Sequence, residues 1–250
     1  MKNAQAKTVY LKDYQPPAFT IQTTQLRFDL FEDYAIVEST LEMQNLSGSD
    51  LLVLHGNNMQ LEELRLDEVS LEPTQYLLDD EQLSIPALGD ILGRSPELFT
   101  LYCRTRIEPQ NNTALEGLYK SKKMFCTQCE AEGFRRITYY LDRPDVMSRF
   151  TTTIISDAER YPVLLSNGNR IAKGAVESDP SRHWVSWEDP FMKPSYLFAL
   201  VAGNLEHMND SFTTMTGREI KLQIFVEEKD LGKIDHAMDS LKRSMRWDEE

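Results

Sequence analysis

An alternation of apolar and polar residues with a period of two runs through the chain from about residue 20 to residue 110. Residues 98–107 show it most clearly, because Arg104 and Arg106 lie on one face of an extended chain and the apolar residues lie on the other. The apolar face comprises Phe99, Leu101, Cys103 and Ile107. Residues 26–30 and 37–43 alternate in the same way, and turn-forming residues separate such runs. The pattern predicts a mainly β fold of antiparallel strands, as a sandwich or a barrel.

Strand signals continue beyond residue 145. Three further strands are predicted by β-branched, aromatic or consecutive apolar residues: 149–155, 184–187 and 196–201. The last of these is apolar at successive positions, so we expect it to be covered on both faces. The pair Asn167-Gly168 lies between apolar residues and predicts a tight hairpin within residues 164–171. A second hairpin is predicted within residues 212–226.

The period changes near the C-terminus. Apolar residues recur there at steps of four, three and four: Ile234, Met238, Leu241 and Met245. This spacing predicts an amphipathic helix, with Asp230 as its N-cap. The helix runs into the acidic residues Asp248, Glu249 and Glu250 without a glycine, a proline or a basic last turn. Because acidic residues oppose the helix dipole at this end, we expect the chain to be cut from something longer.

The charge balance excludes several classes of protein. The chain has 40 acidic and 27 basic side chains, a net charge of −13, which disfavours non-specific binding to nucleic acids or anionic membranes. Its three cysteines indicate a reducing compartment rather than a disulfide-stapled secreted domain. No signal peptide follows Met1, and the apolar run at residues 196–203 is too short to cross a bilayer. We expect a cytoplasmic protein.

Two cysteines, Cys126 and Cys129, form a CxxC pattern that could hold half of a zinc site or form a redox pair. A closed zinc site needs two further ligands at suitable spacing, and no second CxxC or H-x-x-x-H is present. The four histidines are scattered, and the chain has no H-E-x-x-H, G-x-S-x-G or glycine-rich phosphate loop. We therefore predict ordinary thiols, no metal ligand and no catalytic residue in these 250 residues.

Three polar residues follow at alternate positions: Gln128, Glu130 and Glu132. If residues 127–133 are extended, these side chains share one side and could receive an ammonium group through charge-assisted hydrogen bonds. The alternative is a solvated strand face paired with Arg135 and Arg136, and spacing alone favours it. A sharp turn of structural importance is predicted at Pro144, after Asp142.

Several long segments, in order along the chain, resemble the bacterial aminopeptidase N family, zinc metallo-aminopeptidases of the gluzincin group. The similar segments are residues 112–119, 126–135, 137–146, 165–169, 187–191, 196–203 and 245–250. The resemblance spans most of the chain from about residue 14 onward. It implies that residues 1–202 form the family's saddle-shaped, sandwich-like N-terminal β domain, and that residues 203–250 begin a thermolysin-like catalytic domain with a hairpin and a helix.

The family's zinc motif H-E-x-x-H, its distant glutamate ligand and its G-A-M-E-N loop are absent from this chain. The resemblance therefore implies a hydrolase that removes N-terminal amino acids from peptides as a full-length, zinc-containing and monomeric enzyme. We expect the 250 residues alone neither to bind zinc stoichiometrically nor to hydrolyse aminoacyl arylamides. Chelator-sensitive turnover by the purified chain would contradict this expectation.

The family's Q-C-E-A segment corresponds to residues 128–131. The resemblance implies that Glu130 binds the free α-amine of a peptide substrate and that Gln128 lines the pocket for the first side chain. It gives Glu132 no role. A rival hypothesis is a stand-alone β-sandwich module that binds peptides or amines without catalysis. Reading the gene beyond Glu250 separates the two, because an open frame that reaches H-E-x-x-H supports the enzyme.

Overall fold

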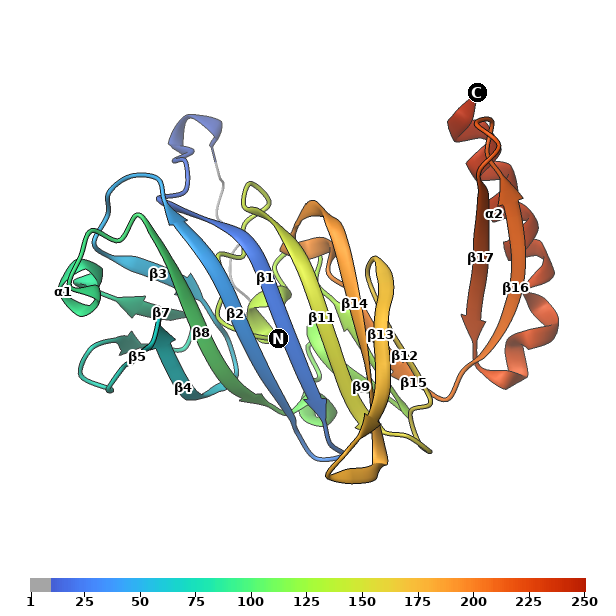
Figure 1. The fold of residues 1–250 in the computed structure, drawn as a ribbon, viewed down its shortest axis with the longest axis horizontal. Helices are drawn as coiled ribbons and strands as arrows, with labels where there is room; N and C mark the ends of the chain where they lie inside the picture. The colour runs from blue at the N-terminus through green and yellow to red at the C-terminus, as the bar shows by residue number, and fades with distance from the viewer. Residues whose placement is uncertain (1–9) are drawn as a thin grey trace.

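An eight-stranded sheet is the largest element of the computed structural model, which describes residues 10–250 (Figure 1). Its strand order is β13-β14-β11-β1-β2-β8-β4-β5. The strands are β1 (Phe19–Leu30), β2 (Ala35–Asn45), β4 (Gln60–Leu66), β5 (Val69–Ser70), β8 (Leu98–Ile107), β11 (Met147–Asp157), β13 (Asn169–Val176) and β14 (Asp179–Pro194). All neighbours pair antiparallel except β1 and β11, which run parallel. The mainly β, antiparallel prediction is confirmed.

Two smaller sheets accompany the large one. The four-stranded sheet has the order β12 (Val163–Ser166), β15 (Leu200–Gly203), β10 (Met124–Gln128) and β9 (Gly117–Ser121). The three-stranded sheet contains β3 (Leu52–His55), β7 (Gln82–Ile85) and β6 (Leu77–Leu78). The short helices of this part are η1 (Leu11–Asp13), α1 (Leu88–Leu92), η2 (Pro109–Asn111), η3 (Phe134–Arg136) and η4 (Ser195–Leu197).

The last part of the chain folds around its own apolar cluster. The hairpin of β16 (Glu206–Thr213) and β17 (Glu219–Val226) is followed by η5 (Glu228–Lys233) and α2 (Asp235–Glu249), which lies along the hairpin (Figure 1). The buried residues of this cluster are Phe212, Leu222 and Met238. They are separate from the main core, and the division of the chain at residues 202 and 203 stays a prediction. No helix within residues 10–250 is long and apolar enough to cross a bilayer.

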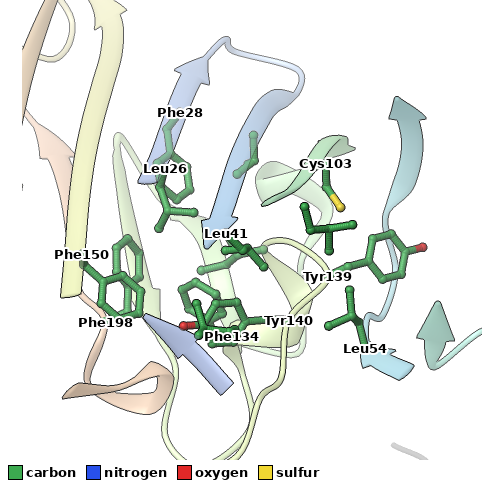
Figure 2. Packing of buried hydrophobic residues seen from close by; sticks show 14 of the residues in the cluster. Leu26, Phe28, Leu41, Leu54, Cys103, Phe134, Tyr139, Tyr140, Phe150 and Phe198 are labelled. Carbon is green, nitrogen blue, oxygen red and sulfur yellow. The ribbon is translucent and has the colours of Figure 1, made fainter. Parts of the chain in front are cut away.

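Aromatic side chains form the centre of the main core (Figure 2). Phe134 lies with its ring centroid 4.7 Å from that of Tyr140, 5.3 Å from that of Phe198 and 6.0 Å from that of Phe150. All four side chains are buried, and they come from η3, from the segment after it, from β11 and from the segment before β15. The cluster therefore packs η3 and the segment before β15 against β11 of the eight-stranded sheet.

Several predicted elements are confirmed. The strand predicted at residues 98–107 is β8, and its alternate residues are buried as expected. The strands predicted at 26–30, 37–43, 149–155 and 184–187 lie within longer strands. The hairpin predicted within residues 212–226 is formed by β16 and β17. These regions share strong alternation or β-branched content, which is why local pattern predicts them well.

The hairpin predicted at Asn167-Gly168 is wrong. The strands on either side of this pair belong to different sheets, since β12 pairs with β15 and β13 pairs with β14. A two-residue hairpin of type I′ needs a positive φ at both central residues, and here Gly168 has one (φ 85°) whereas Asn167 does not. The Asn167 side chain instead bonds to the segment before β15, accepting from the amide of Ala199 at 2.7 Å and donating to the carbonyl of Leu197 at 3.1 Å.

Two further predictions need correction. The strand predicted at residues 196–201 begins later, because Pro194 leads into the 3-10 turn η4 and β15 starts at Leu200. The N-cap of α2 is Ile234 and not Asp230, which lies inside η5. There the Asp230 carboxylate pairs with Lys233, with 2.6 Å between Oδ1 and Nζ, so a local ion pair occupies the carboxylate that was expected to cap the helix.

Candidate functional site

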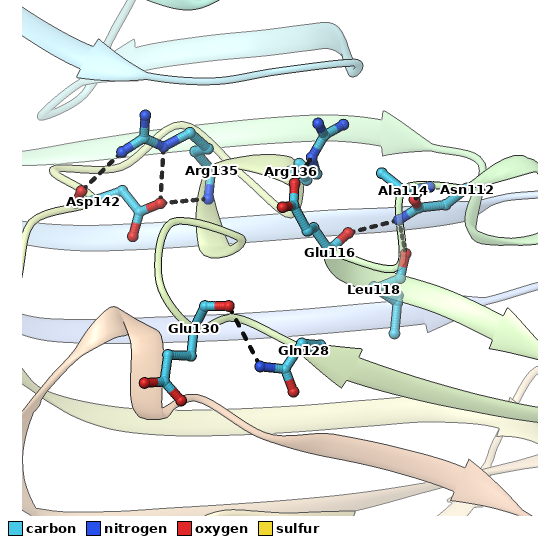
Figure 3. Close-up of polar contacts among 9 residues, drawn as sticks. All are labelled: Asn112, Ala114, Glu116, Leu118, Gln128, Glu130, Arg135, Arg136 and Asp142. Atoms are coloured by element: carbon cyan, nitrogen blue, oxygen red, sulfur yellow. Dashed lines mark hydrogen bonds and ion pairs between the residues drawn. The ribbon is translucent and has the colours of Figure 1, made fainter. Parts of the chain in front are cut away.

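The two predicted site residues lie where β10 ends. Gln128 is the last residue of that strand and pairs with Gly117 of β9, and Glu130 lies in the turn that follows. Figure 3 shows them side by side, with Nε2 of Gln128 donating to the backbone carbonyl of Glu130 at 3.4 Å. The peptide bond between Glu130 and Ala131 is cis. Both side chains are exposed.

The extended conformation expected for residues 127–133 is wrong beyond Gln128. The chain turns there, because the amide of Gly133 donates to the carbonyl of Cys129 at 2.8 Å. Glu132 consequently does not continue the row and pairs with Arg135 at 3.2 Å. The alternative of a solvated face therefore describes Glu132, whereas Gln128 and Glu130 remain neighbours.

Glu130 differs from the acidic residues around it. Glu116 pairs with Arg136 at 3.0 Å, and Asp142 pairs with Arg135 at 3.0 Å (Figure 3). Within the described part of the chain, the Glu130 carboxylate makes no hydrogen bond or ion pair. An ionised carboxylate accepts hydrogen bonds at both oxygens, so this group is available to a cationic donor.

Two glycines let the backbone come close beneath these residues. A β-carbon on Gly133 would lie 2.5 Å from the carbonyl oxygen of Gln128 and 2.9 Å from the amide nitrogen of Gly117. Gly117 has a positive φ of 72°, and a β-carbon there would lie 2.9 Å from the carbonyl oxygen of Gly133. Only glycine fits such an approach, so this contact holds the turn against β9. The sequence patterns gave no separate signal for either glycine.

A buried carboxylate anchors the chain on the other side of the turn. Asp142 Oδ2 accepts from the backbone amide of Arg135 at 3.1 Å and from its Nε at 3.0 Å. Its Oδ1 accepts from the hydroxyl of Ser195 at 2.6 Å. Asp142 thereby ties η3 to η4, which agrees with the structural importance predicted for this segment. Ser195 was not singled out by the sequence, because its partner is 53 positions away.

The two cysteines of the CxxC pattern lie on either side of Gln128 in the chain, and the surroundings of Cys129 disfavour thiolate chemistry. Cys126 and Cys129 are free thiols, and Cys129 is buried. Burial, reinforced by the charge of Asp142, raises the pKa of Cys129 well above its usual value. Metal binding and disulfide exchange both need the thiolate, so this environment opposes them. Residues 10–250 contain no group of three or more His, Cys, Asp or Glu side chains placed to hold a metal ion.

The chain is similar to a known protein family and to curated relatives. Residues 22–197 match the family described as the peptidase M1 N-terminal domain. Aminopeptidase N of Escherichia coli (strain K12) is 46% identical over 247 residues, which cover 98% of this chain and 27% of that protein. Aminopeptidase N of Caulobacter vibrioides is 45% identical over 251 residues, covering 100% of this chain and 28% of that protein. The chain thus spans about a quarter of the length of these relatives.

Solved structures show the same fold. Aminopeptidase A of Legionella pneumophila, crystallised with aspartic acid, superposes with a TM-score of 0.88 at 35% identity, over 96% of this chain and 28% of that one. An M1 zinc metallopeptidase of Deinococcus radiodurans, bound to a Tyr-Ser-Ala substrate, gives a TM-score of 0.69 at 13% identity. At that identity the second similarity concerns the fold alone.

Proposed function

The chain belongs to the peptidase M1 N-terminal domain family, and from this premise we propose that it is the N-terminal part of a zinc aminopeptidase. The enzyme would remove N-terminal amino acids from peptides. Support comes from the near-complete coverage of this chain by bacterial aminopeptidases N at about 45% identity. In this proposal the chain supplies recognition of the substrate amine and one wall of the active-site cleft.

Glu130 is the residue we propose for amine recognition, and the observation that carries the proposal is that its carboxylate has no partner within residues 10–250. The neighbouring carboxylates are occupied by arginines, whereas Glu130 is exposed and free of partners among residues 10–250. A substrate ammonium could donate to it by charge-assisted hydrogen bonds. A carboxylate at a fixed distance from the reacting carbonyl would select the first peptide bond, because it would hold the chain end in one register.

Gln128 is proposed to line the pocket for the first substrate side chain. Its position beside Glu130 supports this role, because a substrate whose amine lies at Glu130 presents its first side chain within a few ångströms. The amide can donate and accept, so it suits a mixed polar and apolar wall.

Zinc does not fit the residues that the structure describes. Within residues 10–250 no group of three or more His, Cys, Asp or Glu side chains is placed to hold a metal ion, and burial raises the pKa of the Cys129 thiol, which opposes its ionisation. The proposal therefore assigns the zinc to a part of the enzyme that these 250 residues do not include, and gives this chain no step through a metal. We further expect a cytoplasmic monomer that acts on peptides with a free N-terminus and binds neither nucleic acid nor membranes.

Glu130→Ala in the full-length enzyme is expected to raise KM and to lower kcat/KM for substrates with a free amine. The expected loss in kcat/KM is about 10–150-fold, since a hydrogen bond to a charged group contributes about 1.5–3 kcal/mol. Steady-state kinetics with an aminoacyl arylamide measures both constants. Because Glu130 is exposed and its carboxylate makes no ion pair among residues 10–250, we expect the free energy of unfolding of the variant to lie within about 0.5 kcal/mol of the wild-type value.

Glu132→Ala is the matched control, since Glu132 is two residues away and pairs with Arg135 at the surface. We expect its kcat/KM to stay within about twofold of the wild type. Unchanged kinetics of the Glu130 variant would remove this residue from the site. An equal loss of kcat/KM in both variants would show that the overall negative charge of this region matters, rather than the Glu130 carboxylate in particular.

A further inference from the structure

A hollow of about 640 Å³ lies beside the turn between β9 and β10, at the opposite end of β10 from Gln128. Its size falls within the range of small-ligand sites. Four cationic side chains line it: Lys120, Lys122, Lys123 and Arg160. The rest of its lining comprises two carboxylates and two neutral polar residues: Glu32, Glu159, Tyr161 and Asn204. The hollow thus has an excess of two positive charges, which is the reverse of the balance of the whole chain, with its 40 acidic and 27 basic side chains.

The carboxylate of Glu32 is already occupied within the protein. Its Oε1 accepts from the hydroxyl of Tyr161 at 2.6 Å. Its Oε2 accepts from Nζ of Lys120 at 2.8 Å and lies 3.3 Å from Nη1 of Arg160. Burial alone would raise the pKa of Glu32, but the hydrogen bonds from these three side chains lower it to about 2. Glu32 is therefore ionised, and it orients three side chains of the lining around one carboxylate.

Lys120 is held in place by more than this ion pair. Its side chain is 15% exposed, and its Nζ lies 5.3 Å from the ring centroid of Phe125 and 6.0 Å from that of Tyr161. An ammonium group has three donors, and the contact with Glu32 uses one of them. Lys120 therefore supplies a fixed positive charge to the lining.

The two lysines of the turn between β9 and β10 are exposed and have no such partner. Neither Lys122 nor Lys123 makes an ion pair or a side-chain hydrogen bond among residues 10–250. Glu227 acts on Lys122 electrostatically, but the Glu227 carboxylate pairs with Lys229. Both ammonium groups of the turn are thus available to an anion from outside the chain.

The backbone of Lys122 is a second observation that points to the side chain. Its φ is 56°, in the left-handed region that glycine adopts most readily. Two-residue hairpin turns usually place glycine or asparagine at such a position. Residues held in sparsely populated backbone conformations concentrate at binding sites. A lysine at this position therefore indicates a use for its ammonium group, since glycine would suit the turn better.

We propose that this hollow binds a phosphate group as its dianion, either as free phosphate or as a small phosphomonoester. Lys122, Lys123 and the remaining nitrogens of Arg160 would donate to the phosphate oxygens. Lys120 would add to the positive field that attracts the anion. The excess of two positive charges in the lining matches the two negative charges of the ligand. The proposal does not depend on the function proposed for Glu130.

The test is a titration of this chain with three ligands, followed by amide NMR: inorganic phosphate, phenyl phosphate and acetate. We choose about pH 8, because the second pKa of a phosphate ester is about 6, and sodium chloride keeps the ionic strength constant. Inorganic phosphate should bind with a Kd on the order of 1 mM, and acetate, with a single charge, at least about tenfold more weakly. Tighter binding of phenyl phosphate than of phosphate identifies a phosphomonoester as the ligand, and weaker binding identifies free phosphate.

The double variant Lys122→Gln/Lys123→Gln should weaken phosphate binding at least about tenfold, because two charge-assisted contacts are lost. The matched control is Arg170→Gln/Lys173→Gln, which removes the same charge from exposed positions of β13. We expect the control to bind phosphate within about twofold of the wild type, since exposed distant charges are screened by salt. The two double variants have the same net charge, so a difference between them reports the hollow and not the overall charge.

Two single variants read the same site in other ways. Glu159→Gln should strengthen phosphate binding, because it removes a negative charge from the lining. Lys122→Gly should weaken phosphate binding and raise the urea midpoint of unfolding, because glycine fits the positive φ. The proposal is overturned if acetate binds as tightly as phosphate, if the double lysine variant keeps the wild-type affinity, or if no ligand saturates the chain about tenfold above 1 mM.

Discussion

Phe134→Ala is expected to lower the free energy of unfolding by about 3–5 kcal/mol, the usual cost of removing a fully buried phenylalanine ring. The Phe134 side chain is inaccessible to solvent and is in contact with three other aromatic rings (Figure 2). Its loss leaves a cavity that cannot collapse easily, because the surrounding rings come from three separate parts of the chain: β11, the segment after η3 and the segment before β15. Urea unfolding followed by circular dichroism measures the change as a lower midpoint at constant slope.

Phe191→Ala provides the control, since the Phe191 side chain is 78% exposed in β14. We expect that variant to change the free energy of unfolding by about 0.5 kcal/mol or less. If Phe134→Ala lowers the free energy of unfolding by less than about 1 kcal/mol, the aromatic cluster does not hold η3 against the eight-stranded sheet in the way described.

Asp142→Ala is also expected to lower the free energy of unfolding by about 3–5 kcal/mol, but here the reason is electrostatic. The Asp142 side chain is 2% exposed and accepts from the backbone and Nε of Arg135 and from the hydroxyl of Ser195. Without it, the Arg135 guanidinium and two further donors lose their acceptor in a poorly hydrated place, and an unpaired buried charge is costly. Chemical denaturation of the purified variant gives the value.

Asp145→Ala is the matched control for this prediction. Asp145 also pairs with an arginine, Arg143, at 2.7 Å, but both side chains are about a third exposed. We expect Asp145→Ala to lower the free energy of unfolding by no more than about 1 kcal/mol. If buried charge is the cause, Asp142→Ala combined with Arg135→Met should be less damaging than Asp142→Ala alone. Additive losses in that double variant would contradict the explanation.

Local pattern was sufficient for strands that bury one face. Alternation in residues 98–107 and 212–226 predicts β8 and the β16–β17 hairpin, because each residue's burial follows directly from its position in the strand. Strand partners were not predictable in this way. Asn167-Gly168 has the composition of a hairpin turn, yet the chain passes there from the four-stranded to the eight-stranded sheet. The hydrogen bonds from Asn167 to Leu197 and Ala199 favour this connection over a hairpin, and they cannot be predicted from the spacing of residues in the sequence.

In the candidate site, too, local features were predictable from the sequence and tertiary contacts were not. The sequence brings Gln128 and Glu130 together because they are close in the chain, and the family resemblance assigns them a role. It could not predict the turn that separates them from Glu132, since that turn depends on the approach of Gly133 to Gly117.

The parallel pairing of β1 with β11 has a consequence for synthesis on the ribosome. β1 obtains its antiparallel partner β2 at once, but its other edge waits for β11, which is made much later. At translation rates of about 5–20 residues per second, the delay is roughly 6–25 s. During this time the open edge of β1 exposes unpaired N–H and C=O groups that a strand of another nascent chain can bind. The largest sheet is therefore completed only after β11, β13 and β14 have been made, and until then the open edge of β1 exposes the chain to aggregation.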